Sequence, residues 1–514
     1  MPRKSLPVGS DLRDRSLVSA TTLFVLFSCC IACFISGCIM DGPFVDQEID
    51  KLVSHDSAVG WAPKGQPTPV TPLAIPVAPT TPEIARRTAE SQVIGAPLLV
   101  ANPTEKLSLT RCLDHALTNS PVTRGAWESA RATAATIGIA DAAYMPDIAF
   151  TSAMGPQRLA EAPMIVTQTP ATAAIGMSWV LMDFGRRDAE SARARAQLIA
   201  ANYTFNRAMQ KLVFDVQSAY FTLDAKISLR EAARENVITA RKQLDATDDR
   251  MTVGLATRPE VLQARQQYLQ TIYDLENAKA EVFIAQSNLA VVMGVPADHA
   301  PDIIALNELP LPDSLTKGVD LAIQSALVQR PDIASAISQV RALQQVTKNA
   351  EANFLPIISF EGSGGITTDN YSYTMPGTTG GSGVPTTGTY SAQITADWLI
   401  FDGYERANVL RQARSNVRAA EAQLEQLRLV TTGQVWASYF DFFSAQKRYE
   451  AGVALLTASQ DSYDSVYQNY LNGLATINDL LLAESFLFDS RFELIKSRAE
   501  LLTASATFVY ALGS

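Results

Sequence analysis

Apolar residues recur at every third or fourth position over long parts of this chain. In one series, Leu212, Val216, Ala219, Leu223 and Ile227 keep this spacing and so share one face of a helix. The surrounding stretch, 185–250, contains no proline, and as a single helix it would be about 100 Å long. Helices of ordinary globular domains are far shorter.

A second spacing, of seven residues, is found near the C-terminus. Leu480, Leu487, Leu494 and Leu501 follow it, and such a repeat favours helices that pack side by side. Two shorter helices placed end to end would nearly match the length of each long one. The pattern therefore predicts a mainly helical fold built from long antiparallel helices.

The second half of the chain repeats the first. Gly254-Leu255-Ala256-Thr257 matches Gly473-Leu474-Ala475-Thr476 at an offset of 219 residues, and Asp183 matches Asp402. Each half predicts two shorter helices, a non-helical region, one very long helix, a glycine turn and a final helix. The expected helices span 107–119, 122–143, 185–250 and 258–293, then 319–329, 332–353, 404–470 and 477–511.

The non-helical regions predict two strands per half. The expected strands are 147–150, 175–181, 357–362 and 390–400, and a glycine-rich exposed loop is expected over 361–389. Four strands are too few to close a barrel, so several chains would have to share one if the strands cross a membrane. Asp183 and Asp402 follow the returning strands and are predicted to cap the long helices.

The first 37 residues have the features of a secretory signal peptide: a basic start, an apolar stretch and small residues before a cleavage point. The segment Ile35-Ser36-Gly37-Cys38 resembles the lipobox of bacterial lipoproteins. That resemblance implies a lipidated Cys38, and Ile39 in place of Asp implies sorting to the outer membrane. The alternative is an unprocessed signal anchor in which Cys38 has no role.

Residues 38–104 read as a lipid-anchored tether. Nine prolines lie between Pro63 and Pro103, interspersed with Thr, Ala and Val. Such composition favours an extended chain without a core of its own. We expect the first structural repeat to occupy 105–306 and the second 307–514.

Composition excludes several classes of function. The formal charge is −10, which argues against a nucleic-acid partner. Four of the five cysteines lie in the first 38 residues, leaving Cys112 as a lone thiol without an assigned role, and the three histidines are scattered. No P-loop or nucleophile-elbow motif is present. We therefore expect no catalytic residue, no metal site and no cofactor.

The lipobox, the duplicated half, the strand pairs that end in Asp and the paired Gly-Leu-Ala-Thr turns together resemble the TolC-like outer-membrane factors. The resemblance covers about 105–513. It implies a homotrimer in the cell outer membrane, extending into the periplasm, with one 12-stranded β-barrel and a long helical α-barrel. It also implies two partners, a periplasmic adaptor protein and an inner-membrane pump.

The same resemblance assigns roles to the repeated turns. In the family, the tips of the helical hairpins meet the adaptor. The matching positions here are Val253, Gly254, Leu255, Gly473 and Leu474. Glycine also permits the positive φ that a tight reversal between helices needs, so these residues could equally be structural.

Family members narrow the pore near the tips with acidic side chains and polar latches. By position, Asp479, Tyr470 and Glu260 would belong to this constriction. The pattern departs from the family at Leu482, where a second acidic residue is expected, and at Ala475, where a basic latch residue is expected. How the closed state is held is therefore open, and apolar contacts are one possibility.

The function most consistent with these features is a passive exit duct of a tripartite efflux pump or a type I secretion system. A structural coiled-coil lipoprotein that tethers envelope layers is the alternative, although it would need neither strand pairs nor a duplicated tip. An envelope enzyme that uses Asp and Glu is a third hypothesis. The sequence leaves the cargo and the identity of pump and adaptor open.

Overall fold

The computed structural model describes residues 51–63, 106–161, 164–299, 301–306, 318–374, 376–377 and 379–513. The chain divides into one unit over residues 1–55 and another over 56–514. Of the first unit, only residues 51–55 are described, as a turn followed by bends. The predicted signal peptide, Cys38 and most of the predicted tether lie outside the described residues.

The helices begin and end close to the predicted residues, and two of them have 67 residues each. None of the helices that the structure describes combines the length and hydropathy that crossing a bilayer requires. The helices are α4 (Leu109–Asn119), α5 (Pro121–Ala142), α6 (Arg186–Thr252), α7 (Arg258–Val292), the short η1 (Ala297–His299), α8 (Val319–Gln329), α9 (Pro331–Ala352), α10 (Glu405–Leu471) and α11 (Ile477–Leu512).

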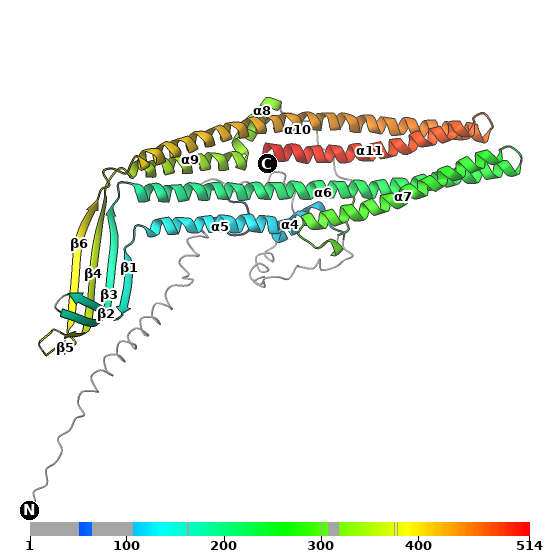
Figure 1. The fold of residues 1–514 in the computed structure, drawn as a ribbon. Coiled ribbons are helices and arrows are strands. Elements are labelled where there is room, and N and C mark those ends of the chain that lie inside the picture. The colour runs from blue at the N-terminus through cyan, green and yellow to red at the C-terminus, as the bar shows by residue number, and fades with distance from the viewer. Residues whose placement is uncertain are drawn as a thin grey trace, which may run out of the picture. The chain divides into compact units, whose positions relative to one another are not determined.

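Within the unit formed by residues 56–514, each long helix is flanked by two shorter ones. Helices α5 and α7 lie end to end along α6, and α9 and α11 lie in the same way along α10 (Figure 1). α9 and α11 also contact α6, so the two halves pack against each other. The mainly helical architecture predicted from the spacing of apolar residues is thus confirmed.

The strands form one antiparallel sheet in the order β1, β3, β4, β6. Two shorter strands extend the edges of the sheet. β2 pairs with β3 on the side that β1 also covers, and β5 pairs with β4 on the side that β6 also covers. The strands are β1 (Asp147–Met154), β2 (Gln157–Glu161), β3 (Met164–Met182), β4 (Ile357–Thr374), β5 (Gly381–Gly383) and β6 (Thr386–Asp397).

The prediction of a loop over 361–389 was wrong for much of its length. Residues through Thr374 continue β4, and β6 begins at Thr386. Glycine is depleted in strands, but here the glycines of β4 are paired on both sides, with β3 and with β6. Pairing on both edges satisfies the backbone and outweighs local propensity.

The sheet has one apolar and one polar face. The register places large apolar side chains on one side, and Ile148 and Ile394 there are 70% and 69% exposed. Residues of this face include Ile148, Phe150, Ile175, Met177, Trp179, Phe360 and Ile394. The alternate positions include Ala149, Thr151, Gly176, Ser178, Glu361, Gln393 and Thr395.

The largest apolar core lies where α4, α6, α7 and α11 meet, midway along the long helices. Tyr220 is fully buried there, and its hydroxyl donates to the carbonyl of Ile304 over 2.6 Å. Cys112 is fully buried in the same core, where burial raises the pKa of its thiol to about 12. The lone thiol therefore packs as a small apolar residue and stays unreactive.

Part of the predicted tether is fixed on the helices. The side chain of Asn206 on α6 accepts from the backbone N–H of Trp61 and donates to its carbonyl, each over 2.7 Å. The Trp61 ring also meets Tyr203 edge to face, with centroids 5.3 Å apart. Residues around Trp61 are thus held by the body of the protein.

Candidate functional site: the hairpin tips and their supports

The two hairpin tips have the same backbone geometry. Gly254 and Gly473 each have φ of +76°, which a residue with a side chain adopts only with strain. The amide of Leu255 donates to the carbonyl of Arg250 over 2.8 Å, and Leu474 bonds Asn469 in the same way over 2.7 Å. Both long helices therefore end in a Schellman motif, which supplies partners for their last carbonyls.

Apolar side chains project from these tips. Val253, Leu255 and Leu474 are 68%, 66% and 79% exposed. Bulky apolar residues held outward by a rigid turn form a surface that a partner can cover. The structure thus places all the predicted tip residues at the two reversals.

The two predicted acidic residues occupy equivalent positions, each three residues after the N-cap threonine of its helix, and Asp479 forms a capping box there. Asp479 accepts from the backbone N–H and the hydroxyl of Thr476, over 2.9 and 2.7 Å, and these bonds lower the pKa of its carboxyl group. Glu260 accepts from the hydroxyl of Thr257 over 3.2 Å. The spacing of Thr with an acid three residues later is the sequence signal of a capping box, and it could have predicted the role of Asp479.

Arg250 is the residue that sequence reasoning missed. It lies near the end of α6 and donates to the carbonyl of Leu471, at the end of α10, over 2.8 Å. Its guanidinium stands 4.7 Å from the centre of the Tyr470 ring, and it also donates to the carbonyl of Leu255 over 3.3 Å. A cation placed at two helix C-termini complements both dipoles, so Arg250 joins the two hairpins at their tips.

Tyr470 supports the same junction from inside. Its ring is 2% exposed, and its hydroxyl group lies 3.3 Å from that of Thr247 on α6. Ala475 packs against the apolar cluster that contains Tyr470, whereas Leu482 is 57% exposed. The tip is therefore held by buried apolar packing together with a cation from α6 in place of the expected basic residue at position 475.

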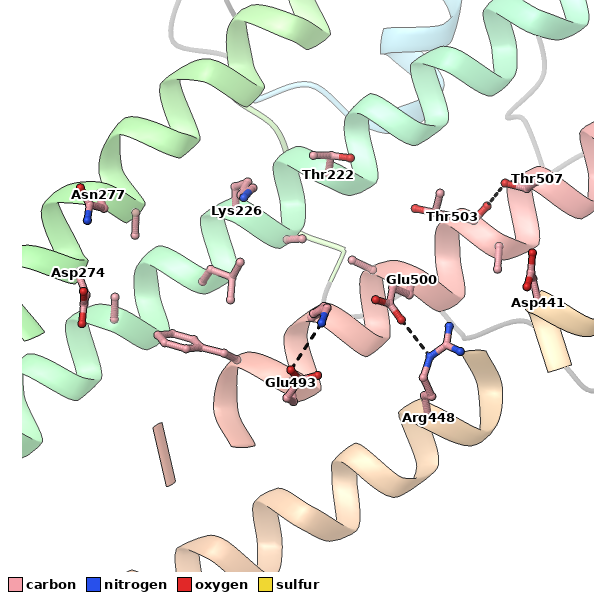
Figure 2. A pocket seen from close by; sticks show the side chains of 18 residues that line it. Thr222, Lys226, Asp274, Asn277, Asp441, Arg448, Glu493, Glu500, Thr503 and Thr507 are labelled. Atoms are coloured by element: carbon pink, nitrogen blue, oxygen red, sulfur yellow. Dashed lines mark hydrogen bonds and ion pairs between the residues drawn. The ribbon is translucent and has the colours of Figure 1, made fainter. Parts of the chain in front are cut away.

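A groove runs between the two hairpins farther from the tips. It has a volume of about 790 Å³ and is lined by α6, α7, α10 and α11 (Figure 2). Arg448 pairs with Glu500 across α10 and α11 over 3.0 Å, and Lys496 pairs with Glu493 along α11. Charges of both signs thus rim a floor of alanine and leucine side chains, which suits an amphipathic partner.

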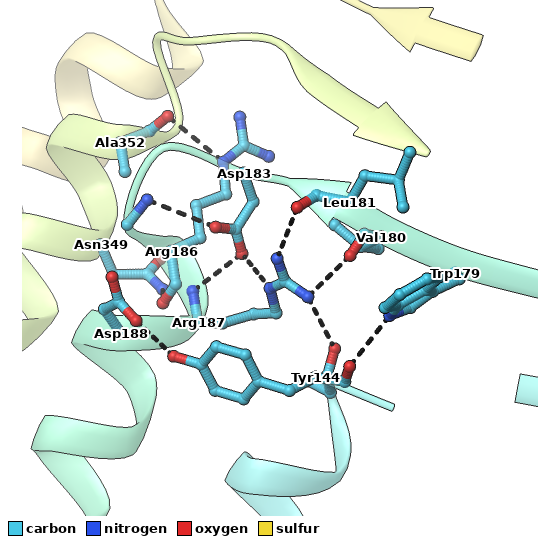
Figure 3. Close-up of polar contacts among 12 residues, drawn as sticks. Tyr144, Trp179, Val180, Leu181, Asp183, Arg186, Arg187, Asp188, Asn349 and Ala352 are labelled. Carbon is cyan, nitrogen blue, oxygen red and sulfur yellow. Dashed lines mark hydrogen bonds and ion pairs between the residues drawn. The ribbon is translucent and has the colours of Figure 1, made fainter. Parts of the chain in front are cut away.

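The passage from strand to long helix is held by an Asp–Arg pair. Asp183 accepts from the backbone and the guanidinium of Arg187, both over 2.9 Å, and Arg187 also donates to the carbonyl of Val180 over 2.7 Å (Figure 3). Asp402 and Arg406 repeat this arrangement in the second half. Each pair therefore fixes the angle at which the sheet leaves the helices.

The prediction that Asp183 and Asp402 are the N-cap residues was wrong in position. Gly185 and Tyr404 occupy the N-caps, both with positive φ, and neither provides a side-chain cap. Each carboxylate instead lies two residues before the N-cap residue and accepts from an N–H group of the first turn. The tight turn after each strand separates the acid from the cap position, yet leaves its oxygen facing the first-turn N–H groups.

The described residues include no group of three or more His, Cys, Asp or Glu side chains arranged to hold a metal ion. The main structural features are a sheet with one apolar and one polar face, two strand-to-helix junctions held by Asp–Arg pairs, and two hairpin tips of the same geometry.

Comparison with known proteins identifies the class. A profile of the outer membrane efflux protein family matches residues 112–295 and 322–514, more than half of the chain. The protein CyaE of Bordetella pertussis is 26% identical over 415 residues, which cover 80% of this chain and 85% of CyaE. The outer membrane protein TolC of Escherichia coli is 24% identical over 316 residues, 60% of this chain and 63% of TolC.

The fold is also that of a solved channel. The outer-membrane channel OprN superposes with a TM-score of 0.67 at 20% identity, covering 79% of this chain and 89% of OprN. The chain belongs to the outer membrane efflux protein family. It is therefore a TolC-like outer-membrane efflux protein, a passive channel component and not an enzyme.

Replacing Arg250 should loosen the junction between the tips. Arg250→Ala removes charge-assisted bonds worth about 1–2 kcal/mol, so we expect the population of separated tips to rise about tenfold. Spin labels at Val253→Cys and Leu474→Cys would report the distance between tips. Arg258→Ala, which removes an exposed arginine at the start of α7, is the control, and an equal change in that variant would contradict the role of Arg250.

Proposed function

We propose that three copies of this chain form the exit duct of a tripartite efflux pump or a type I secretion system. The sheet supports this proposal most strongly, because it has a large apolar face and two edge strands, β1 and β6, each with one neighbour among the described strands. An apolar face is suited to contact with lipid. Unpaired strand edges are not, because backbone N–H and C=O groups inside a bilayer need hydrogen-bond partners.

Antiparallel closure by copies of the same chain removes both edges. Successive main strands alternate in direction, so β1 and β6 run oppositely. The β6 edge of one copy can then continue as an antiparallel ladder with β1 of the next. Four main strands from each of three copies would give the 12-stranded barrel that the family resemblance implies, with the apolar face toward lipid and the polar face toward the lumen.

Two tryptophans mark the helix-proximal edge of the apolar face. The indole N–H of Trp179 donates to the carbonyl of Tyr144 over 2.9 Å, and Trp398 donates to Phe354 over 3.0 Å. Tryptophan is enriched where hydrocarbon meets water. We infer that the membrane boundary lies at this level and that the helices extend into the periplasm from it.

The tips and the groove are the proposed contacts for partners. An adaptor with apolar ends would cover Val253, Leu255 and Leu474, and an amphipathic hairpin would fit the groove along α10 and α11. The duct itself supplies no energy, so an inner-membrane pump would drive transport. Cargo selection would lie with that pump.

Anchoring through a lipid on Cys38 is compatible with the fixed position of Trp61. Asn206, which holds Trp61, lies about 30 Å along α6 from its first residue, at about 1.5 Å per residue. Residues 51–59 form turns and bends, but the 13 residues from Cys38 to Lys51 alone can span about 43 Å when extended, at about 3.3 Å per residue. A lipid on Cys38 would therefore reach the inner leaflet of the outer membrane.

Lipidation predicts a defined N-terminus. Mass spectrometry of the mature protein should find a peptide that begins at Cys38 and carries acyl chains, and Cys38→Ala should lose both the acyl mass and the cleavage. Cys112→Ser, which alters a buried thiol elsewhere, should change neither. A mature N-terminus without acyl mass would contradict the lipid anchor.

The duct itself is tested by conductance in a planar bilayer. The purified protein should give current steps of a single conductance value, and the channel should prefer cations. If Asp479 lies at the narrowest point, Asp479→Ala should lower that cation preference several-fold, whereas Asp489→Asn on an exposed face of α11 should not. A complete absence of channel events would favour the alternative of a structural tether, and unchanged selectivity would reject only the role of Asp479.

A further inference from the structure

One carboxylic acid is buried between the hairpins near the tips. Glu484 of α11 is 0% exposed, and neither of its oxygens has a hydrogen-bond partner. It lies about 10 Å along the helix from Ile477, at about 1.5 Å per residue. A buried, unpaired carboxylate is costly, whereas the neutral acid is tolerated.

The residue of α6 at the same level follows from the register of the two helices. Arg491 of α11 donates to the side-chain oxygen of Asn236 on α6 over 2.8 Å. One heptad toward the tip on each antiparallel helix leads to Glu484 and Gln243. Gln243 is 1% exposed, and both of its side-chain polar atoms also have no partner. Two unsatisfied polar groups thus occupy one level of the interface between hairpins.

Among the described residues, no cation lies close enough to neutralise the charge of an ionised Glu484. On α10 it faces Tyr463, which is 8% exposed and packs with the apolar cluster of the tip. Arg491 lies two turns away, where it bonds Asn236 and is near Glu235 of α6 and Asp464 of α10. Burial alone raises the pKa of Glu484 to about 8, and burial raises the pKa of Tyr463 as well.

We propose that Glu484 is the proton-dependent gate of the tip: as a neutral acid it lets the two hairpins pack together, and its ionisation separates them. An ionised Glu484 must regain water, and the hairpins must part for water to enter. The proposal rests on the duct function, because it names the group that sets the aperture of that duct.

The direction of the pH effect follows from proton linkage. The closed tip holds the proton more tightly than a hydrated tip, in which the pKa of glutamic acid is close to its ordinary value of 4.5. The advantage of the closed tip is complete below that value and is lost as pH rises through about 8. The ratio of open to closed tips should therefore rise about tenfold per pH unit between pH 5 and pH 8, then level off.

The test compares three full-length proteins in planar bilayers between pH 5 and pH 9. The wild type should show the predicted rise in open probability. Glu484→Gln keeps the shape of the side chain without a titrating group, so it should stay closed and lose the pH dependence. Asp489→Asn removes an exposed carboxylate five residues along the same helix and should behave as the wild type. The proposal would be overturned if the open probability of Glu484→Gln still rose with pH, or if that of Asp489→Asn no longer did.

A second measurement separates this proposal from the duct function. Spin labels at Val253→Cys and Leu474→Cys report the tip distance without requiring conduction. Longer distances at pH 9 than at pH 6 in the otherwise wild-type protein, and no change in Glu484→Gln, support the gate even if no current flows. Distances that are independent of pH in both proteins overturn the gate even if the protein conducts.

Discussion

The constraint on which the rest depends is that a strand in hydrocarbon leaves no backbone group without a partner. This chain carries an antiparallel sheet with an apolar face, yet β1 and β6 each end the sheet with one free edge. A single copy cannot close that sheet, because four main strands are too few for a barrel. In the proposed trimer, closure by identical copies would satisfy the edges and, at the same time, arrange the long helices around a common axis.

The long helices follow directly from the strands of the sheet and are joined to one another at several levels. The Asp183–Arg187 and Asp402–Arg406 pairs fix the two exits from the sheet, and the core around Tyr220 joins the helices midway. Near the tips, an apolar cluster around Tyr470 is accompanied by two polar features: Arg250 links the ends of α6 and α10, and Glu484 is buried without a hydrogen-bond partner.

Much of the architecture could be predicted from the sequence, because long periodic segments such as 185–250 determine their own helices. The extent of β4 could not, since its glycines disfavour a strand locally and are held in one by pairing with β3 and β6. Asp479 and Glu260 are expected at a constriction by resemblance; in the structure Asp479 also forms a capping box with Thr476, which the Thr-x-x-acid spacing already indicated, and Glu260 accepts from the hydroxyl of Thr257. Arg250 and Glu484 have no local signal, because their roles depend on the register between separate hairpins.

Disulfide trapping between the edge strands tests shared closure most directly. Ala149→Cys on β1 would be combined in turn with Ser391→Cys, Gln393→Cys or Thr395→Cys on β6, which share the polar face. Within one copy β3 and β4 separate these positions by about 14 Å, at about 4.8 Å per strand, too far for a disulfide. Closure predicts, for at least one pair, oxidised species of two and three chains and none larger. Only single chains for every pair, or ladders beyond three, would contradict it.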